Sequence, residues 1–161
     1  DEEGVCYRRS GRKTRPDYTA GLQKTAKELG GQVWHNADLL EEINYLVEYP
    51  TPLYGRIDEE FLDLPVPAVV TPMRDHQRYY PVRKQDGSLM PYFLTVRNGG
   101  DRAIRNVQIG NERVLRARLD DAKFFFDGDR RKSLEGHREA LSRINYQEGM
   151  GTMLDLSLIH I

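Results

Sequence analysis

The sequence predicts an α+β fold, a mixed or antiparallel sheet with flanking helices, for a chain about one domain long. Three observations predict it. Two segments near the start carry apolar residues at helical spacing, the middle holds two segments rich in tyrosine, phenylalanine and valine, and residues 110–126 form a long amphipathic pattern. Helices therefore precede and follow a central sheet, instead of alternating with its strands as in a wound parallel sheet.

The first two predicted helices cover residues 16–29 and 38–49. Proline and aspartate open the first helix, and Gly30 with Gly31 would end it. Asp38 and Glu41 match a capping box at the start of the second helix, which Pro50 would stop. In the loop between them we expect Trp34 to pack and His35 to face solvent.

The middle of the chain contains several short predicted elements, both strands and helical turns. Residues 51–57 predict a strand, and residues 59–62 predict one helical turn. Pro67 suits a helix start, whereas Pro72 removes a hydrogen bond and predicts a kink. Residues 78–83 and 90–96 predict a hairpin around the turn at residues 85–88. A further helical segment is expected over residues 134–144.

Residues 110–126 predict a long helix with an apolar stripe at Leu115, Leu119, Ala122 and Phe126. Its charges can pair along the helix, because Glu112 precedes Arg116 by four and Arg116 precedes Asp120 by four, while Arg118 precedes Asp121 by three. Two interpretations stay open for Arg113, Arg116 and Arg118. They belong to a solvated, self-paired face, or they contact nucleic acid.

The bulk composition limits the function classes. Twenty-four basic and 25 acidic residues leave a net charge of -1, so any contact with RNA must be local. The first fifteen residues are the basic exception, and a solvated terminal arm is the simpler interpretation. Cys6 is the single cysteine, so no disulfide framework or Cys/His zinc site is expected. No apolar run approaches the roughly 20 residues that span a bilayer, which favours the cytoplasm.

A polar and aromatic cluster follows the predicted kink. In a functional interpretation Arg74, His76 and Arg78 meet phosphates or a terminal nucleotide, and Tyr79 or Tyr80 offers a ring for base stacking. In the alternative, His76 and Gln77 satisfy buried backbone groups and one tyrosine of the pair packs inward. No nucleophile motif, acid pair, metal-ligand spacing or phosphate-binding glycine loop occurs, so we assign no catalytic residue, no metal ligand and no cofactor to this segment.

Several blocks of the sequence also resemble a known family, in the same order. They include Glu60-Phe61-Leu62-Asp63-Leu64-Pro65, Met73-Arg74-Asp75-His76-Gln77-Arg78-Tyr79-Tyr80-Pro81-Val82, Phe93-Leu94-Thr95-Val96-Arg97-Asn98, the arginine-bearing helix, and Gln147-Glu148-Gly149-Met150-Gly151-Thr152. Over residues 20–155 the chain resembles the β subunit of the bacterial two-subunit glycyl-tRNA synthetase. The resemblance implies an internal fragment from the N-terminal half of that subunit.

The resemblance also implies an organisation. Residues 1–37 would form a basic arm and the first helix. Residues 38–155 would form part of a module like the editing domain of phenylalanyl-tRNA synthetase, ending where an HD-type domain begins. Residues 156–161 break the family pattern, so we expect them to be a non-native tail and assign His160 no role.

The family further implies a function for the whole enzyme. It is the ATP-dependent ligation of glycine to tRNA(Gly) by an α2β2 heterotetramer, with ATP and Mg used by the α subunit. This segment would then serve aminoacylation and protein biosynthesis through tRNA binding and subunit assembly, without being the activation site. Two alternatives remain, which are an α/β subunit-interface module without RNA contact, suggested by Phe124, Phe125 and Phe126, and a residual editing-type hydrolysis.

Overall fold

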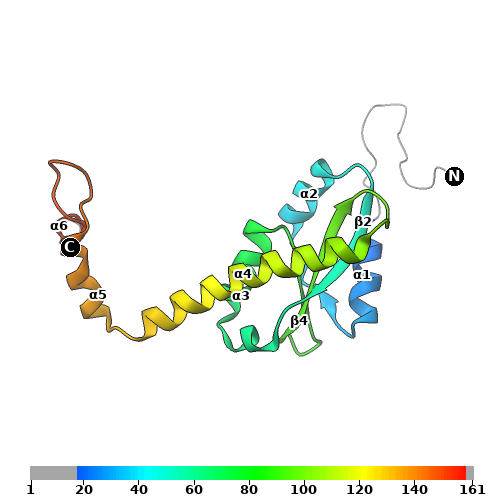
Figure 1. Ribbon diagram of the computed structural model, residues 1–161, viewed down its shortest axis with the longest axis horizontal. Coiled ribbons are helices and arrows are strands. Elements are labelled where there is room, and N and C mark those ends of the chain that lie inside the picture. The colour runs from blue at the N-terminus through cyan, green and yellow to red at the C-terminus, as the bar shows by residue number, and fades with distance from the viewer. Residues whose placement is uncertain (1–17, 159–161) are drawn as a thin grey trace. The chain divides into compact units, whose positions relative to one another are not determined.

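The computed structural model describes residues 18–158 (Figure 1). The predicted basic arm at residues 1–15, Cys6, the first turn of the first helix, and His160 lie outside the described residues. The described chain divides into two compact units between Lys123 and Phe124. The elements are α1 Tyr18–Glu28, β1 Gln32–Val33, α2 Ala37–Leu46, β2 Pro50–Arg56, η1 Glu59–Asp63, α3 Val66–Thr71, η2 Pro72–His76, β3 Tyr80–Arg83, β4 Leu89–Asn98, α4 Ile104–Arg130, α5 Leu134–Ala140, η3 Leu141–Arg143 and α6 Met153–Leu158.

The first unit contains one four-stranded antiparallel sheet in the order β1-β3-β4-β2, which confirms the α+β prediction. Both faces of this sheet are covered. Phe93 and Leu94 are neighbours in β4, so their side chains point to opposite faces, and both are fully buried. The Leu94 side forms the larger core with α1 and α2, through residues such as Leu22, Ala26 and Ile43. The sheet is therefore the middle layer of this unit.

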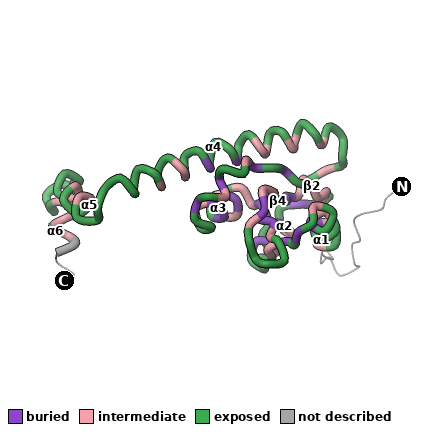
Figure 2. The backbone as a smooth tube through the Cα atoms, turned by 90° about the horizontal axis from the view of Figure 1, so that it is seen from below, coloured by how far each residue is buried: buried purple, intermediate pink, exposed green. Residues whose placement is uncertain are grey.

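The opposite face is built around Phe93. The ring of Tyr79 stacks on Phe93 with 4.5 Å between ring centroids. Gly55, directly opposite Phe93 in the β2–β4 pairing, leaves space for that ring, which a Cβ atom would enter. Figure 2 shows α4 on this side of the strands, with α1 and α2 on the other. Leu115 and Leu119 of α4 are both 0% exposed, so the helix contributes to the core of the first unit.

Strand β2 is an edge strand whose free edge is blocked. The Arg56 N–H points away from β4, because it donates to Glu112 Oε1 in α4 at 2.9 Å. Alternate residues of a strand present their N–H groups to the same edge, so Pro50 and Pro52 occupy the outward positions. Proline has no N–H to offer another strand. These prolines and Glu112 together protect the edge against pairing with a further strand.

Most predicted elements are confirmed, and one cap differs. Gly30 follows α1 with a φ of +80°, as the predicted helix stop requires. Helix α2 is capped by Asn36, whose side-chain oxygen accepts from the N–H groups of Asp38 and Leu39. The predicted capping box at Asp38 is therefore wrong. Asn36 took the position because it precedes the helix in extended conformation, where its side chain reaches back to the first N–H groups.

The predicted kink and hairpin are confirmed. Helix α3 continues into a short π-helical segment at Pro72, since proline cannot supply the regular hydrogen bond. Strands β3 and β4 form the hairpin, and the Asp86 carboxylate accepts from the Ser88 N–H and hydroxyl in the turn. Gly87 has a φ of +85°, which a side chain would disfavour.

The second unit carries the end of α4, then α5, η3 and α6. Ser133 caps α5 by accepting from the Gly136 N–H at 3.2 Å. The predicted helical segment at 134–144 is thus confirmed as α5 and η3. Between η3 and α6, a bridge between Asn145 and Thr152 closes a short loop. No residue in the described part of this unit with an assigned exposure is buried.

Candidate nucleic-acid interface

Helix α4 carries three of the predicted RNA-binding arginines. Its apolar stripe is confirmed, with Leu115 and Leu119 buried and Ala122 and Phe126 half-buried. The helix is longer than the predicted 110–126, because it begins at Ile104 and ends at Arg130. Gly110 lies inside it, where no atom stands within 4 Å of an added Cβ, so this exposed glycine costs stability without ending the helix.

The charged residues of α4 bind the segment after β2 rather than one another. Arg116 Nη2 lies 2.7 Å from Asp58 Oδ2, and Lys123 Nζ lies 2.5 Å from Glu60 Oε2. Glu112 accepts the Arg56 N–H. Within residues 18–158, no ion pair joins Glu112 to Arg116, Arg116 to Asp120 or Arg118 to Asp121, so the predicted pairing along the helix is wrong.

The physical reason is that the Glu112 carboxylate has two possible partners, a side chain on its own helix and a backbone N–H at the end of β2, which bind it with unequal strength. A helical i,i+4 ion pair contributes only about 0.2–0.5 kcal/mol. A hydrogen bond to a charged group contributes about 1.5–3 kcal/mol, which makes the Arg56 N–H the stronger partner for the Glu112 carboxylate. Lys123 also lowers the pKa of the Glu60 carboxyl, first through its hydrogen bond and then through its charge. The result is a set of charged links between α4 and residues 56–60.

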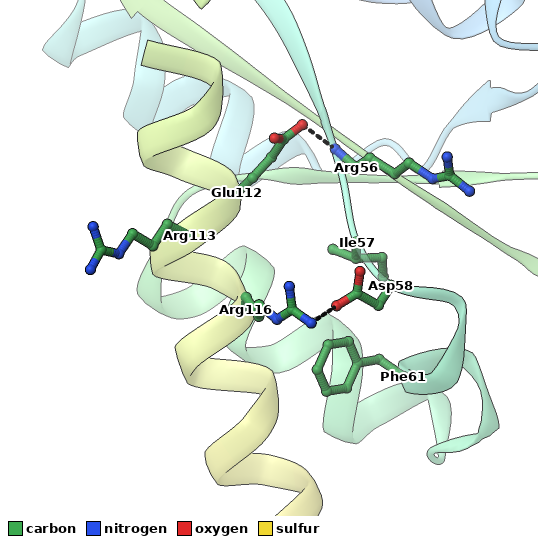
Figure 3. Close-up of a pocket in the computed structure, with 7 residues that line it drawn as sticks. All are labelled: Arg56, Ile57, Asp58, Phe61, Glu112, Arg113 and Arg116. Carbon is green, nitrogen blue, oxygen red and sulfur yellow. Dashed lines mark hydrogen bonds and ion pairs between the residues drawn. The ribbon is translucent and has the colours of Figure 1, made fainter. Parts of the chain in front are cut away.

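A hollow of about 360 Å³ lies along these links (Figure 3). Its lining residues are Arg56, Ile57, Asp58, Phe61, Glu112, Arg113 and Arg116. Figure 3 shows the Arg116 guanidinium turned toward Asp58, while the side chains of Arg56 and Arg113 extend away from the hollow. The hollow therefore contains paired charges, and the guanidinium most available to an external anion is that of Arg113.

The three arginines of α4 do not form one patch. At about 100° per residue, Arg113 and Arg116 lie about 60° apart around the helix axis, whereas Arg118 lies about 160° from Arg116. Arg113 and Arg118 are exposed, and neither forms an ion pair with any other described residue. One straight phosphate backbone could thus reach Arg113 and Arg116 together, while Arg118 faces the other flank.

The second predicted group follows the π-helical segment, and its arginines are already paired. Arg74 Nε lies 2.7 Å from Asp75 Oδ1, and this hydrogen bond lowers the pKa of the Asp75 carboxyl. Arg78 Nε lies 2.8 Å from Glu42 Oε1, and its Nη1 donates to the Asp75 carbonyl. His76 is exposed. An RNA phosphate would have to compete with these carboxylates for both guanidinium groups.

Arg78 adopts a left-handed backbone conformation, with a φ of +58°. Its N–H donates to the Arg74 carbonyl, and the Tyr79 N–H donates to the Met73 carbonyl at 2.9 Å. The bond from Arg78 to Arg74 is that of an αL cap, where glycine is the usual left-handed residue. The conformation turns the chain from helix to strand and brings Tyr79 and Tyr80 into the interior.

Tyr79 cannot stack on a base in this structure. Its ring is 5% exposed and lies against Phe93, and burial raises the pKa of its hydroxyl to about 12. Tyr80 is also buried, and burial raises its pKa further. Both tyrosines therefore pack inside the protein. In a sheet with only one covered face, one of the two neighbouring side chains would point to solvent, but both faces of this sheet are covered.

Sequence reasoning missed Arg56, Asp58 and Glu60 as partners of α4. The only signal was acidic residues directly after a predicted strand, which does not identify a distant helix as their partner. The described residues bring together no group of three or more histidine, cysteine, aspartate or glutamate side chains able to hold a metal ion. None of their helices combines the length and apolar character needed to cross a membrane.

Comparison with known proteins identifies similar chains. The sequence profile of the family described as glycyl-tRNA synthetase beta subunit matches residues 1–157. The chain is 53% identical over 129 residues to the glycine–tRNA ligase beta subunit of Moorella thermoacetica, and 49% identical over 135 residues to that of Clostridioides difficile. These matches cover 80% and 84% of this chain but 19% and 20% of the relatives. The chain thus spans about a fifth of their length.

Proposed function

This chain belongs to the glycyl-tRNA synthetase β subunit family, and from that premise we propose that it serves glycine–tRNA ligation as a tRNA-contacting and assembly segment. It is not the activation site. ATP with Mg would be used by the α subunit of an α2β2 enzyme in the cytoplasm. The observation that carries the RNA contact is Arg113, an exposed guanidinium without an ion pair in the described part of the chain, directed away from the hollow.

The contact we propose is with the phosphate backbone of tRNA(Gly), centred on Arg113. Arg116 lies on the same flank of α4 and its side chain is 60% exposed, so it can share a phosphate while it remains near Asp58. Arg74, His76 and Arg78 form a second and weaker candidate, since both arginines are paired with carboxylates. Tyr79 is left out of the proposal because its ring is covered.

The test compares arginines on the two flanks of α4 in the full-length β subunit with the α subunit present. Arg113→Gln should weaken tRNA(Gly) binding and reduce the slope of log K against log salt by about 1, because one phosphate contact is lost. Arg118→Gln is the matched control, since it removes the same charge from the opposite flank. Equal slopes for both variants and the parent, with folding intact, would reject the phosphate contact.

A second candidate function is supported by exposed aromatic rings. Phe124 and Phe125 are 73% and 66% exposed, and their rings meet edge to face with 5.6 Å between centroids. The next ring, Phe126, is half-buried and carries the Arg130 guanidinium over it. Exposed aromatic groups of this kind favour a protein interface, for which the α subunit is the candidate partner.

This second candidate has its own test. Replacing Phe124 and Phe125 together by serine should reduce capture of the α subunit by the tagged β subunit. Replacing two exposed polar residues of the same helix, Asp120 and Asp127, by serine serves as the control for helix surface changes. Undiminished capture by the phenylalanine variant would dismiss this interface.

A further inference from the structure

The described residues 133–156 form an ordered segment without an interior. They contain α5, η3, the loop closed by Asn145 and Thr152, and most of α6, yet none of them is buried. Four of their large apolar side chains are exposed, namely Leu134 at 90%, Ile144 at 52%, Tyr146 at 49% and Met150 at 62%. An isolated helix of seven residues is unstable in water, so α5 cannot persist on its own propensity.

The loop of this segment is held in shape by its own backbone. The Met153 N–H donates to the Ile144 carbonyl at 2.8 Å, and the Tyr146 N–H donates to the Gly151 carbonyl at 3.1 Å. The Asp155 carboxylate accepts from the Thr152 N–H at 2.9 Å, and this bond lowers the pKa of that carboxyl. The loop thus presents Tyr146 and Met150 on a shaped backbone, although no core beneath it supplies the stabilisation.

We propose that residues 133–156 dock on another part of the same β subunit, with Leu134, Ile144, Tyr146 and Met150 as the buried contacts. The inference rests on the proposed function only in that the chain is taken as part of a longer β subunit. The relatives are about five times longer than the part matched here, so most of the subunit is available as the covering surface.

Two arguments select this occupant. Between residues 133 and 156 the sequence has two arginines, Arg138 and Arg143, against four acidic residues, Glu135, Glu139, Glu148 and Asp155. This acidic excess repels a phosphate backbone, so the partner is protein rather than RNA. A segment that lacks a core of its own requires a permanent partner surface. Another part of the same polypeptide provides that surface at a high effective concentration, whether or not the α subunit is bound.

The experiment measures access to single cysteines in the full-length β subunit, with every native cysteine, including Cys6, replaced by serine. Met150→Cys reports the proposed contact, and Lys132→Cys, an exposed position before α5, is the control. In the β subunit without the α subunit, Met150→Cys should react with a maleimide at least about tenfold more slowly than Lys132→Cys. In the 161-residue chain alone, the two cysteines should react at similar rates.

Each other outcome overturns the proposal. Rapid reaction of Met150→Cys that becomes slow only when the α subunit is added would assign the surface to that subunit. Rapid reaction in every sample would show that nothing covers it, and slow reaction in the 161-residue chain would place the cover within residues 1–161. If Met150→Cys does not fold, Leu134→Cys gives the same readout. None of these results bears on the salt dependence of tRNA binding, so the two proposals fail separately.

Discussion

Arg116 Nη2 and Asp58 Oδ2 lie 2.7 Å apart and join the middle of α4 to the segment that follows β2. The same helix reaches the end of β2 through Glu112, which accepts the Arg56 N–H, and reaches the following segment again through Lys123, which pairs with Glu60. The polar side of α4 is therefore part of the tertiary structure. Whether an arginine of this helix can contact RNA therefore depends on its tertiary partner as well as on its position in the sequence.

The Arg116–Asp58 pair should contribute little to stability, because both side chains are substantially exposed. A double-mutant cycle with Arg116→Gln and Asp58→Asn should give a coupling free energy of unfolding of about 0.2–1 kcal/mol, decreasing with added salt. Urea unfolding at low and high salt measures it. A coupling well above this range, or one unchanged by salt, would contradict the description of the pair as an exposed link.

Gly55 should be intolerant of a side chain. An added Cβ would enter the ring of Phe93, which is fully buried, so Gly55→Ala should lower the free energy of unfolding by about 1–3 kcal/mol. Gly110→Ala is the matched control. It adds the same methyl group to an open position in α4 and should raise stability by about 0.5–1 kcal/mol. Chemical denaturation of both variants compares them, and similar effects would argue against the close packing of β2 on β4.

The cap of α2 distinguishes two neighbouring polar residues. Asn36→Ala should destabilise the protein by about 1 kcal/mol, because two N–H groups lose their acceptor. Asp38→Ala should cost less, about 0.3–0.5 kcal/mol, through the lost interaction of a carboxylate with the helix dipole. Thermal or urea unfolding ranks the two variants. A larger loss for Asp38→Ala would restore the capping box expected from the sequence.

Glu60 should make stability depend on acidity. Lys123 lowers the pKa of its carboxyl below the ordinary 4.5, so the unfolded chain takes up this proton more readily than the folded chain. The stabilisation that the Glu60–Lys123 pair gives the folded state is complete above pH 4.5 and is lost as the pH falls through the pKa of Glu60 in the folded protein. The difference in urea midpoint between the parent and Glu60→Gln should therefore shrink under acid conditions. Glu41→Gln, at an exposed position of α2, is the control for the removal of a surface carboxylate.

Local sequence rules determined the elements of this protein well. The spacing of Leu115 and Leu119, the stop at Gly30, the kink at Pro72 and the hairpin around Gly87 all depend on neighbours within a few residues, and the structure has each of them. Helix and turn formation are governed by such short-range sterics and hydrogen bonds. The α+β class followed from the order of these elements, and membership in the family followed from the order of the matching blocks.

Only the tertiary structure decided which polar groups remain available. The sequence assigned Glu112 to Arg116, whereas the folded chain brings the Arg56 N–H and the Asp58 carboxylate to that side of the helix. The sequence left the Tyr79 ring as a candidate for base stacking, whereas in the folded chain both faces of the sheet are covered and this ring packs on Phe93. Such partners are distant in sequence, and the free energy of a buried or edge group depends on what surrounds it in space. No local pattern contains that information.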